Sequence, residues 1–178
     1  MKAVRSALIT VTCLSAFLLA GCGGEETVDI SDYLGKYDYQ SPAAALVWEQ
    51  VEGEDEGVYG IQYRNVTDFN GLTSQKDTAV CLYFYSASAR GTQSLTAGVE
   101  DLAQTLVGQV IFVAVDGVEA DEISTAYHVA GYPDFILIND GMRIDTFNGF
   151  DREEWNIEDV ADWLADYGFT PDLTMLER

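Results

Sequence analysis

Two uninterrupted apolar segments limit the folds open to this chain. Val110–Val115 is apolar throughout and rich in β-branched side chains, and Ala79–Tyr85 is a second apolar run. A strand with one face in water alternates polar and apolar residues, whereas a strand covered on both faces is apolar along its whole length. We therefore expect an α/β fold in which helices cover both faces of a central sheet.

From Val58 onward the sequence alternates between strand and helix patterns. The expected strands are 59–63, 79–85, 110–115, 135–138 and 143–147, and the expected helices are 66–74, 93–107, 119–128 and 157–167, the last capped by Asn156. The order β-α-β-α-β-α-β-β-α predicts parallel strands joined by helical crossovers, followed by an antiparallel edge hairpin across Asn139–Gly141. The sheet is therefore expected to be mixed.

The start of the chain resembles the signal segment of a bacterial lipoprotein. Lys2 and Arg5 precede the apolar stretch Ala7–Leu19, which is too short to span a bilayer comfortably. Leu19-Ala20-Gly21-Cys22 resembles the lipobox, whose cysteine thiol receives a diacylglycerol. We expect a cleaved signal peptide over 1–21, a lipid with palmitate on Cys22, and a mature chain anchored outside the cytoplasm on the cell membrane. A plain signal peptide with an incidental cysteine is the alternative.

The charge of the chain argues against nucleic acid as a partner. The net charge is −21, and it becomes −23 once Lys2 and Arg5 leave with the signal peptide. Such an acidic chain repels nucleic acid and anionic headgroups, so we expect it to contact the membrane through its lipid. The acidic clusters 52–56, 116–122 and 151–154 lack the spacing and central glycine of a calcium loop. No metal site and no cofactor are expected.

Cysteine usage argues against a disulfide in the mature protein. Cys13 leaves with the signal peptide and Cys22 carries the lipid, which leaves Cys81 alone inside an apolar strand. A single thiol in such a strand is expected to be a small buried hydrophobe.

The region between the lipid and Val58 has a different composition. Residues 22–57 are rich in Gly, acidic residues and Tyr, and we interpret them as a lipidated tether and irregular extension. Within them, Ala43–Val51 is apolar enough to form a short strand or helical turn that docks on the domain. We place the domain at 58–169 and a C-terminal tail at 170–178.

Several motifs resemble those of thioredoxins and protein disulfide isomerase domains. The segment Tyr127–Pro133 reads Tyr-His-Val-Ala-Gly-Tyr-Pro and is followed by a strand and Asn139-Asp140-Gly141, much as in that family. Phe147-Asn148-Gly149 and Val113-Ala114-Val115-Asp116 also have counterparts there. The resemblance implies a thioredoxin-like fold with an N-terminal extension, and a cis peptide bond between Tyr132 and Pro133.

The two positions that carry the family's catalytic cysteines differ in this chain. If Phe84-Tyr85-Ser86 matches the family's Phe-Trp-Ala, these positions fall on Ala89 and Thr92, with Arg90-Gly91 between them. Pro133 follows Ala89 by 44 positions, the interval between the first cysteine and the cis-proline in thioredoxins. Tyr83 stands where many thioredoxins have a buried acid. The resemblance therefore implies the fold without the thiol chemistry.

A peptide-binding groove is the candidate site that remains. In thioredoxins the residue before the cis-proline pairs its backbone with an extended polypeptide, a mode of strand addition that needs no cysteine. The resemblance places this groove at residues Ser88, Ala89, Arg90, Gly91, Thr92, Tyr132, Pro133 and Gly149. Serine chemistry there would need a base, and His128, the only histidine, is expected to face solvent or cap a helix.

The sequence leaves several functions open. The leading hypothesis is a redox-inactive, membrane-anchored binding or accessory module for an extended polypeptide or an envelope protein. The alternatives are a groove with no ligand, a thiol–disulfide oxidoreductase by fold only, and a structural subunit of an envelope complex that makes contact through residues 23–57.

Overall fold

A computed structural model describes residues 29–51, 53–89 and 92–177 of the chain. The expected signal peptide, the expected lipidation site Cys22 and the predicted groove residues Arg90 and Gly91 lie outside the described residues. Within the described residues, no helix is long and apolar enough to cross a membrane.

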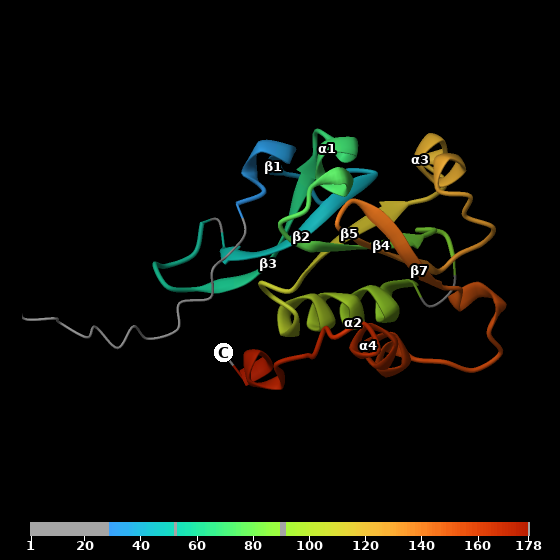
Figure 1. The fold of residues 1–178 in the computed structure, drawn as a ribbon. Coiled ribbons are helices and arrows are strands. Elements are labelled where there is room, and N and C mark those ends of the chain that lie inside the picture. Colours follow the sequence, from blue (N-terminus) through green and yellow to red (C-terminus); the bar gives the residue numbers. More distant parts are fainter. Residues whose placement is uncertain (1–28, 52, 90–91, 178) are drawn as a thin grey trace, which may run out of the picture.

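The described residues form one seven-stranded mixed sheet (Figure 1). In spatial order the strands are β1 (Leu34–Tyr37), β3 (Tyr59–Val66), β2 (Ala43–Gln50), β5 (Val110–Asp116), β4 (Ala79–Tyr85), β6 (Asp134–Asn139) and β7 (Met142–Phe147). β4 and β5 are parallel, and every other neighbouring pair is antiparallel. The expected mixed sheet and its edge hairpin β6–β7 are confirmed.

Strand β2 enters the sheet at a position that the sequence analysis did not anticipate. It lies between β3 and β5 and is antiparallel to both, with Ala43 opposite Val115 and Leu46 opposite Phe112. The sequence predicts that Ala43–Val51 is a short strand or helical turn of the extension that docks on the domain. The structure makes Ala43–Gln50 an eight-residue strand of the sheet, so the sheet begins well before Val58.

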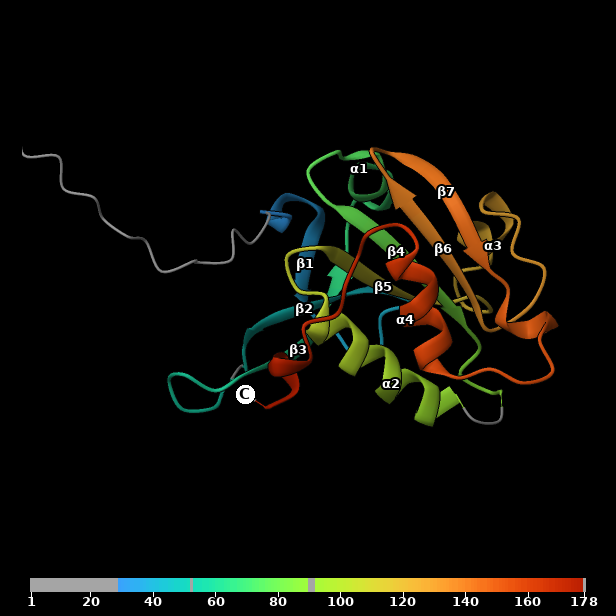
Figure 2. The ribbon, with the colours of Figure 1, turned by 60° about the horizontal axis from the view of Figure 1, so that its bottom comes forward.

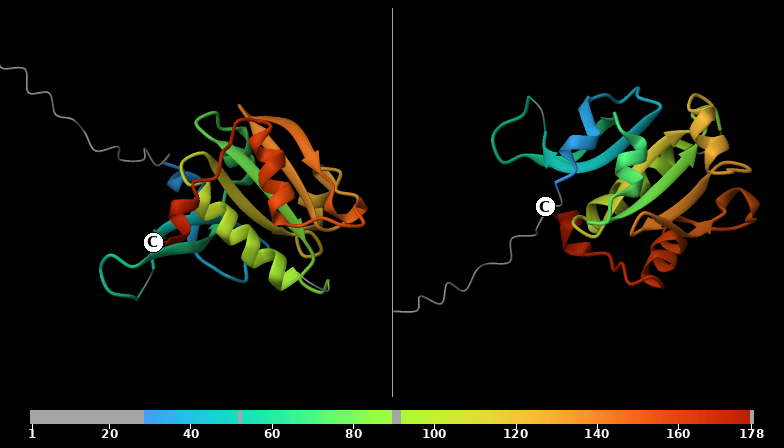
Figure 3. Two further views of the ribbon diagram at one scale, coloured as in Figure 1. Left: turned by 90° about the horizontal axis from the view of Figure 1, so that it is seen from below. Right: turned by 45° about the horizontal axis from the view of Figure 1, so that its top comes forward.

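The second half of β2 continues past β5 and pairs with β3 alone, from Val47 to Gln50. Beyond the body of the sheet these two strands form a hairpin that projects outward (Figure 3). Trp48 and Tyr59 stack across it, with ring centroids 6.4 Å apart. The hairpin ends in an exposed acidic loop, residues 53–57.

Helices cover both faces of the sheet, as expected from its apolar strands. α2 (Thr92–Thr105) and α4 (Ile157–Ala165) lie on one face, and α1 (Phe69–Ser74) and α3 (Asp121–Ala126) on the other (Figures 1 and 2). Three short 3₁₀ helices complete the part of the chain that the structure describes: η1 (Ser31–Tyr33), η2 (Gly149–Asp151) and η3 (Leu173–Glu177). The last of them lies in the expected C-terminal tail.

The N-terminus of α4 is capped as the sequence predicts. The side chain of Asn156 accepts hydrogen bonds from the backbone N–H groups of Glu158 and Asp159, at 2.8 and 3.2 Å. The Asp159 carboxylate accepts one from the Asn156 N–H at 2.7 Å, which completes a capping box. The cap fixes where the chain turns into α4, and that turn borders the candidate site.

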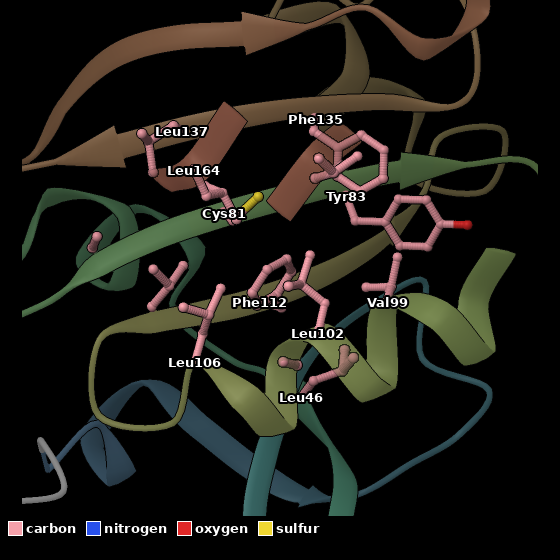
Figure 4. Packing of buried hydrophobic residues seen from close by; sticks show 14 of the residues in the cluster. Leu46, Cys81, Tyr83, Val99, Leu102, Leu106, Phe112, Phe135, Leu137 and Leu164 are labelled. Carbon is pink, nitrogen blue, oxygen red and sulfur yellow. The ribbon is translucent and has the colours of Figure 1, made fainter. Parts of the chain in front are cut away.

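Each face of the sheet has its own core. On the α2 and α4 face, Leu102, Leu106 and Leu164 pack against side chains of the central strands (Figure 4). On the α1 and α3 face, Leu72 and Ile136 belong to the second cluster. Cys81 is fully buried in the first core and its thiol is free, as expected of a small hydrophobe.

Candidate functional site

A cleft of about 490 Å³ opens where β4 leads into α2. Its walls come from the end of β4, the first turns of α2, the loop before β6 and the start of α4. The lining residues are Tyr83, Tyr85, Ser86, Ala89, Thr92, Ser94, Leu95, Gly98, Tyr132, Pro133, Trp155, Asn156 and Ile157. Three separate stretches of the sequence, 83–98, 132–133 and 155–157, therefore meet at one opening.

The cleft contains four of the predicted groove residues. Ala89 and Thr92 line it from the α2 side, and Tyr132 and Pro133 line it from the loop before β6. Gly149 is buried behind the wall. A Cβ atom added there would lie 2.7 Å from the Trp155 ring and 3.0 Å from the Pro133 carbonyl oxygen, so glycine allows these groups to approach.

Ser88 lies beside the cleft lining. Its hydroxyl is 3.0 Å from the hydroxyl of Ser86, which does line the cleft. Ser88 therefore belongs to the turn that shapes the opening, while its neighbour Ala89 forms part of the wall.

The loop before β6 is held by the side chain of Tyr132 and by hydrogen bonds of its neighbours. The Tyr132–Pro133 peptide bond is cis, as the resemblance implied. The Tyr132 hydroxyl donates a hydrogen bond to the Gly117 carbonyl at 2.7 Å. The Pro133 carbonyl accepts one from the Phe150 N–H at 2.9 Å. Within the described part of the chain, the N–H and C=O of Tyr132 have no backbone partner.

The turn between β4 and α2 is held by hydrogen bonds to the Ser86 carbonyl. The Thr92 hydroxyl and the Ala89 N–H both donate to this oxygen, each at 2.9 Å. The Thr92 side chain thus serves the turn. His128, the only histidine of the sequence, is exposed and does not line the cleft. The hydroxyl groups of this turn therefore lack an imidazole base.

The deep wall of the cleft is aromatic. Tyr83 is fully buried, and its ring stacks on Phe135 and Tyr85, with centroids 5.0 and 5.4 Å away. Its hydroxyl lies 3.3 Å from the Thr96 hydroxyl. Burial raises the pKa of Tyr83 to about 12, so the phenol stays protonated at neutral pH. A carboxylate at this position could accept a proton. The protonated phenol of Tyr83 cannot.

The sequence profile of the thioredoxin family matches residues 60–162, more than half of the chain. The chain belongs to the thioredoxin family. The match begins in β3 and ends in α4, so it covers all four walls of the cleft. The thioredoxin-like α/β fold expected from the sequence is thereby confirmed.

Solved thioredoxin structures are similar to this chain at low sequence identity. Mitochondrial thioredoxin 3 of Saccharomyces cerevisiae is 24% identical, with a TM-score of 0.48, and the match covers 55% of this chain and 86% of that one. A mutant thioredoxin from Halobacterium salinarum is 26% identical, with a TM-score of 0.47 and coverage of 57% and 83%. The thioredoxin of Plasmodium falciparum is 20% identical, with a TM-score of 0.47 and coverage of 56% and 88%.

Sequence reasoning did not find the α4 side of this thioredoxin-family cleft. Trp155 and Ile157 line it, together with Leu95 and Gly98 of α2. The ring of Trp155 packs edge-on against Phe135, with centroids 6.0 Å apart. A tryptophan just before a helix cap carries no signal that it will fold toward a turn more than 60 positions earlier in the sequence. The helical spacing of Leu95 and the other apolar residues of α2 indicates a face that packs in the core, and it does not indicate that Leu95 lines a cleft.

The residue after Pro133 is a second feature that the sequence analysis passed over. Asp134 is buried, with 2% of its surface exposed, and its Oδ1 atom has no hydrogen-bond partner within the described residues. Burial raises the pKa of this carboxyl to about 6, although the positive charge of Arg143 opposes the shift. Because side chains alternate along β6, Asp134 points away from the cleft, toward the α1 and α3 face.

Proposed function

We propose that this protein is a redox-inactive binding module of the thioredoxin family that holds an extended polypeptide by strand addition. One observation carries the proposal: the backbone of Tyr132, which has no backbone partner among the described residues, lies beside an open cleft. An extended chain that paired with this backbone would run along the cleft and place alternate side chains into it.

The absence of redox activity is inferred from the groups that line the cleft. Thiol–disulfide exchange needs a thiolate that attacks and a second sulfur that leaves. Ala89 has no nucleophile, and the Thr92 hydroxyl is engaged with the Ser86 carbonyl. Cys81 is buried, and burial raises the pKa of its thiol far above the ordinary value. These features favour a binding module over a thiol–disulfide oxidoreductase.

The same proposal assigns the module to the outer face of the cell membrane. Cys22 would carry the lipid, with palmitate among its acyl chains, and the acidic body would stand off the anionic headgroups. Its partner would then be an extended polypeptide or an envelope protein outside the cytoplasm.

An unfolded polypeptide probe tests the binding function. The mature chain in detergent is titrated against fluorescently labelled ribonuclease A that has been reduced and carbamidomethylated, and binding is followed by anisotropy. We expect saturable binding of this probe and none of folded ribonuclease A. Failure of the unfolded probe to bind would contradict the proposal.

A matched pair of variants locates the binding site. Ala89→Trp places a large ring in the cleft wall and is expected to weaken binding of the unfolded probe by about tenfold or more. Ala87→Trp is the control, because Ala87 is exposed in the same turn and does not line the cleft. Equal losses in the two variants would place binding elsewhere.

Insulin reduction separates the binding module from the enzyme. In the presence of dithiothreitol, the mature chain is expected to leave the rate of insulin precipitation at its background value. Acceleration that persists after Cys81 has been alkylated in the unfolded protein and the protein refolded would show a redox function.

A further inference from the structure

The cleft has an aromatic pocket on its α4 side that a backbone-binding groove does not require. Tyr83, Tyr85 and Trp155 supply its rings, and Leu95 and Ile157 supply aliphatic surface. The whole cleft measures about 490 Å³, which lies within the range of ligand pockets. Such a pocket gains most from a large apolar side chain, because affinity comes chiefly from apolar surface removed from water.

The rings that form this pocket are held in place before any ligand arrives. Trp155 packs against Phe147 as well as Phe135, with ring centroids 5.4 and 6.0 Å away. Tyr85 stacks on Tyr83, and the cap on Asn156 fixes the turn that carries Trp155. A preformed pocket costs little ordering entropy on binding, so it can discriminate between side chains.

The rim of the pocket is acidic on two sides. Beyond β5, the Gly117 N–H donates to the Tyr85 carbonyl at 2.8 Å, and the exposed Glu119 follows two residues later, within electrostatic range of Tyr85. Burial raises the pKa of Tyr85 most, and the negative charges of Asp116 and Glu119 raise it further. On the other side, the exposed residues Glu153 and Glu154 immediately precede Trp155.

Among the described residues that line the cleft there is no lysine or arginine. The guanidinium of Arg152 lies over the Phe147 ring, 4.0 Å from its centroid, and is therefore engaged in a cation–π contact. In the sequence, Arg90 is the only lysine or arginine between Lys76 and Arg143. With a net charge of −21 for the chain as a whole, the field at the cleft favours a positively charged ligand.

We infer that the cleft selects an extended, basic polypeptide segment that inserts one large apolar side chain between α2 and α4. This inference rests on the proposed function, because it names the sequence that strand addition at Tyr132 would present. The apolar side chain fills the pocket at Trp155, while lysine or arginine residues on either side of it face Glu119 and the pair Glu153 and Glu154.

Four synthetic peptides test the selection. The parent is a fluorescein-labelled nonapeptide, Gly-Ser-Lys-Ser-Phe-Ser-Lys-Ser-Gly; the others replace Phe by Ala, both Lys by Gln, or both Lys by Glu. Binding to the mature chain in detergent is measured by anisotropy. We expect the Ala and Gln peptides each to bind about tenfold more weakly than the parent, and the Glu peptide to bind weakest. Equal affinities for all four, or tightest binding of the Glu peptide, would overturn the inference.

Variants then assign each preference to its own part of the cleft. Ser94→Trp fills the mouth of the pocket from an exposed position on α2 and is expected to remove the advantage of Phe over Ala; Gln93→Trp, exposed but outside the lining, keeps it. Trp155→Ala is expected to act like Ser94→Trp, and thermal unfolding shows whether it remains folded. Retention of the Phe advantage by Ser94→Trp would refute the pocket.

Charge variants test the rim. The triple variant Glu119→Gln, Glu153→Gln, Glu154→Gln is expected to lose the preference for Lys over Gln and much of the salt dependence of binding. The control removes three acidic charges from the hairpin loop, with Glu54→Gln, Asp55→Asn and Glu56→Gln, and should keep both. If the two triple variants had equal effects, the preference for Lys over Gln would come from the net charge of the protein and not from the rim of the pocket.

The outcomes separate this inference from the proposed function. If unfolded ribonuclease A binds through the cleft but the four peptides bind equally, the module holds polypeptide without the selection inferred here. If neither the unfolded protein nor any of the four peptides binds, both the function and the selection are wrong.

Discussion

Asp134, a single residue beside the site, is expected to lower the stability of the folded protein by a measurable amount. Its carboxyl lies at the first position of β6, directly after the cis-proline, and its Oδ1 atom is buried without a partner in the described residues. A buried carboxylate with one unpartnered oxygen destabilises the folded state when it is ionised, and the backbone hydrogen bond from Phe135 offsets this only in part. The destabilisation caused by this carboxylate can be measured as a change in the unfolding free energy with pH.

We predict that Asp134 makes the folded state lose stability as the pH rises. Its pKa of about 6 in the folded protein exceeds the ordinary value of 3.8, so its contribution is fully present below about pH 4 and lost by about pH 6. The difference in unfolding free energy between the wild type and Asp134→Asn should therefore fall by about 3 kcal/mol between pH 3 and pH 7. Urea unfolding at each pH measures it.

Asp145 supplies a control of opposite sign. Hydrogen bonds from the Trp163 indole at 2.9 Å and the Tyr167 hydroxyl at 2.7 Å hold the pKa of this carboxyl below its ordinary value. Its contribution is present at neutral pH and is lost as the pH falls through the folded pKa. If Asp134→Asn and Asp145→Asn showed pH dependences of the same sign, the assignment at Asp134 would be wrong.

At the scale of elements, the start of α4 links helix capping to the site. Asn156 caps the helix and also lines the cleft beside Trp155. We predict that Asn156→Ala lowers the unfolding free energy by about 1 kcal/mol, the usual cost of losing an N-cap. Because the cap fixes the turn at Trp155, the same variant should weaken binding of the unfolded probe. Binding and stability both at wild-type values would show that the turn is held without the cap.

Helices and strands could be predicted where a short stretch of sequence specifies them. The strands and helices after Val58 follow the expected order, because periodicity, capping and turn residues are written into short windows of sequence. The hairpin between β6 and β7 is one case: Asp140 and Gly141 adopt the positive φ angles that its turn needs. The place of β2 was not predictable in the same way. It pairs with β3 and β5, and β5 lies more than 60 positions further along the sequence, so no short window of sequence specifies the pairing. The segments that flank β2 are also rich in Gly and acidic residues, which is typical of a tether.

The candidate site was predictable only on one side. Ala89, Thr92, Tyr132 and Pro133 were found because motif spacing implied their positions, and the structure brings them to one cleft. Trp155 carries no such spacing. Its role arises from the packing of α4 against α2, which depends on side-chain volumes across the sheet.

At the scale of the whole molecule, the start of the described chain and the cleft lie at opposite ends. The described chain begins near η1 and β1, while α2 begins at the cleft on the far side of the sheet (Figures 1 and 2). Six residues, 23–28, separate Cys22 from Asp29. Fully extended, they would reach about 25 Å. A lipid on Cys22 would therefore keep the body close to the bilayer and leave the cleft facing away from it.

The expected lipid anchor gives a direct prediction. Replacing Cys22 by Ser is expected to abolish incorporation of an alkyne-labelled fatty acid, because the serine oxygen cannot form the thioether to diacylglycerol. Metabolic labelling followed by gel fluorescence measures it, with Cys13→Ser as the matched control that should affect the label only slightly. Label retained by the Cys22→Ser protein would contradict the lipoprotein assignment.

Strand addition at Tyr132 is the central claim, and hydrogen exchange of the Tyr132 amide tests it most directly. The N–H and C=O of Tyr132 have no backbone partner within the described part of the chain, so the free protein should exchange this amide rapidly. When reduced, carbamidomethylated ribonuclease A is bound, the account predicts slower exchange at Tyr132, and wild-type-like rapid exchange when the Ala89→Trp variant is mixed with the same probe. Bound polypeptide with unchanged exchange at Tyr132 would contradict strand addition.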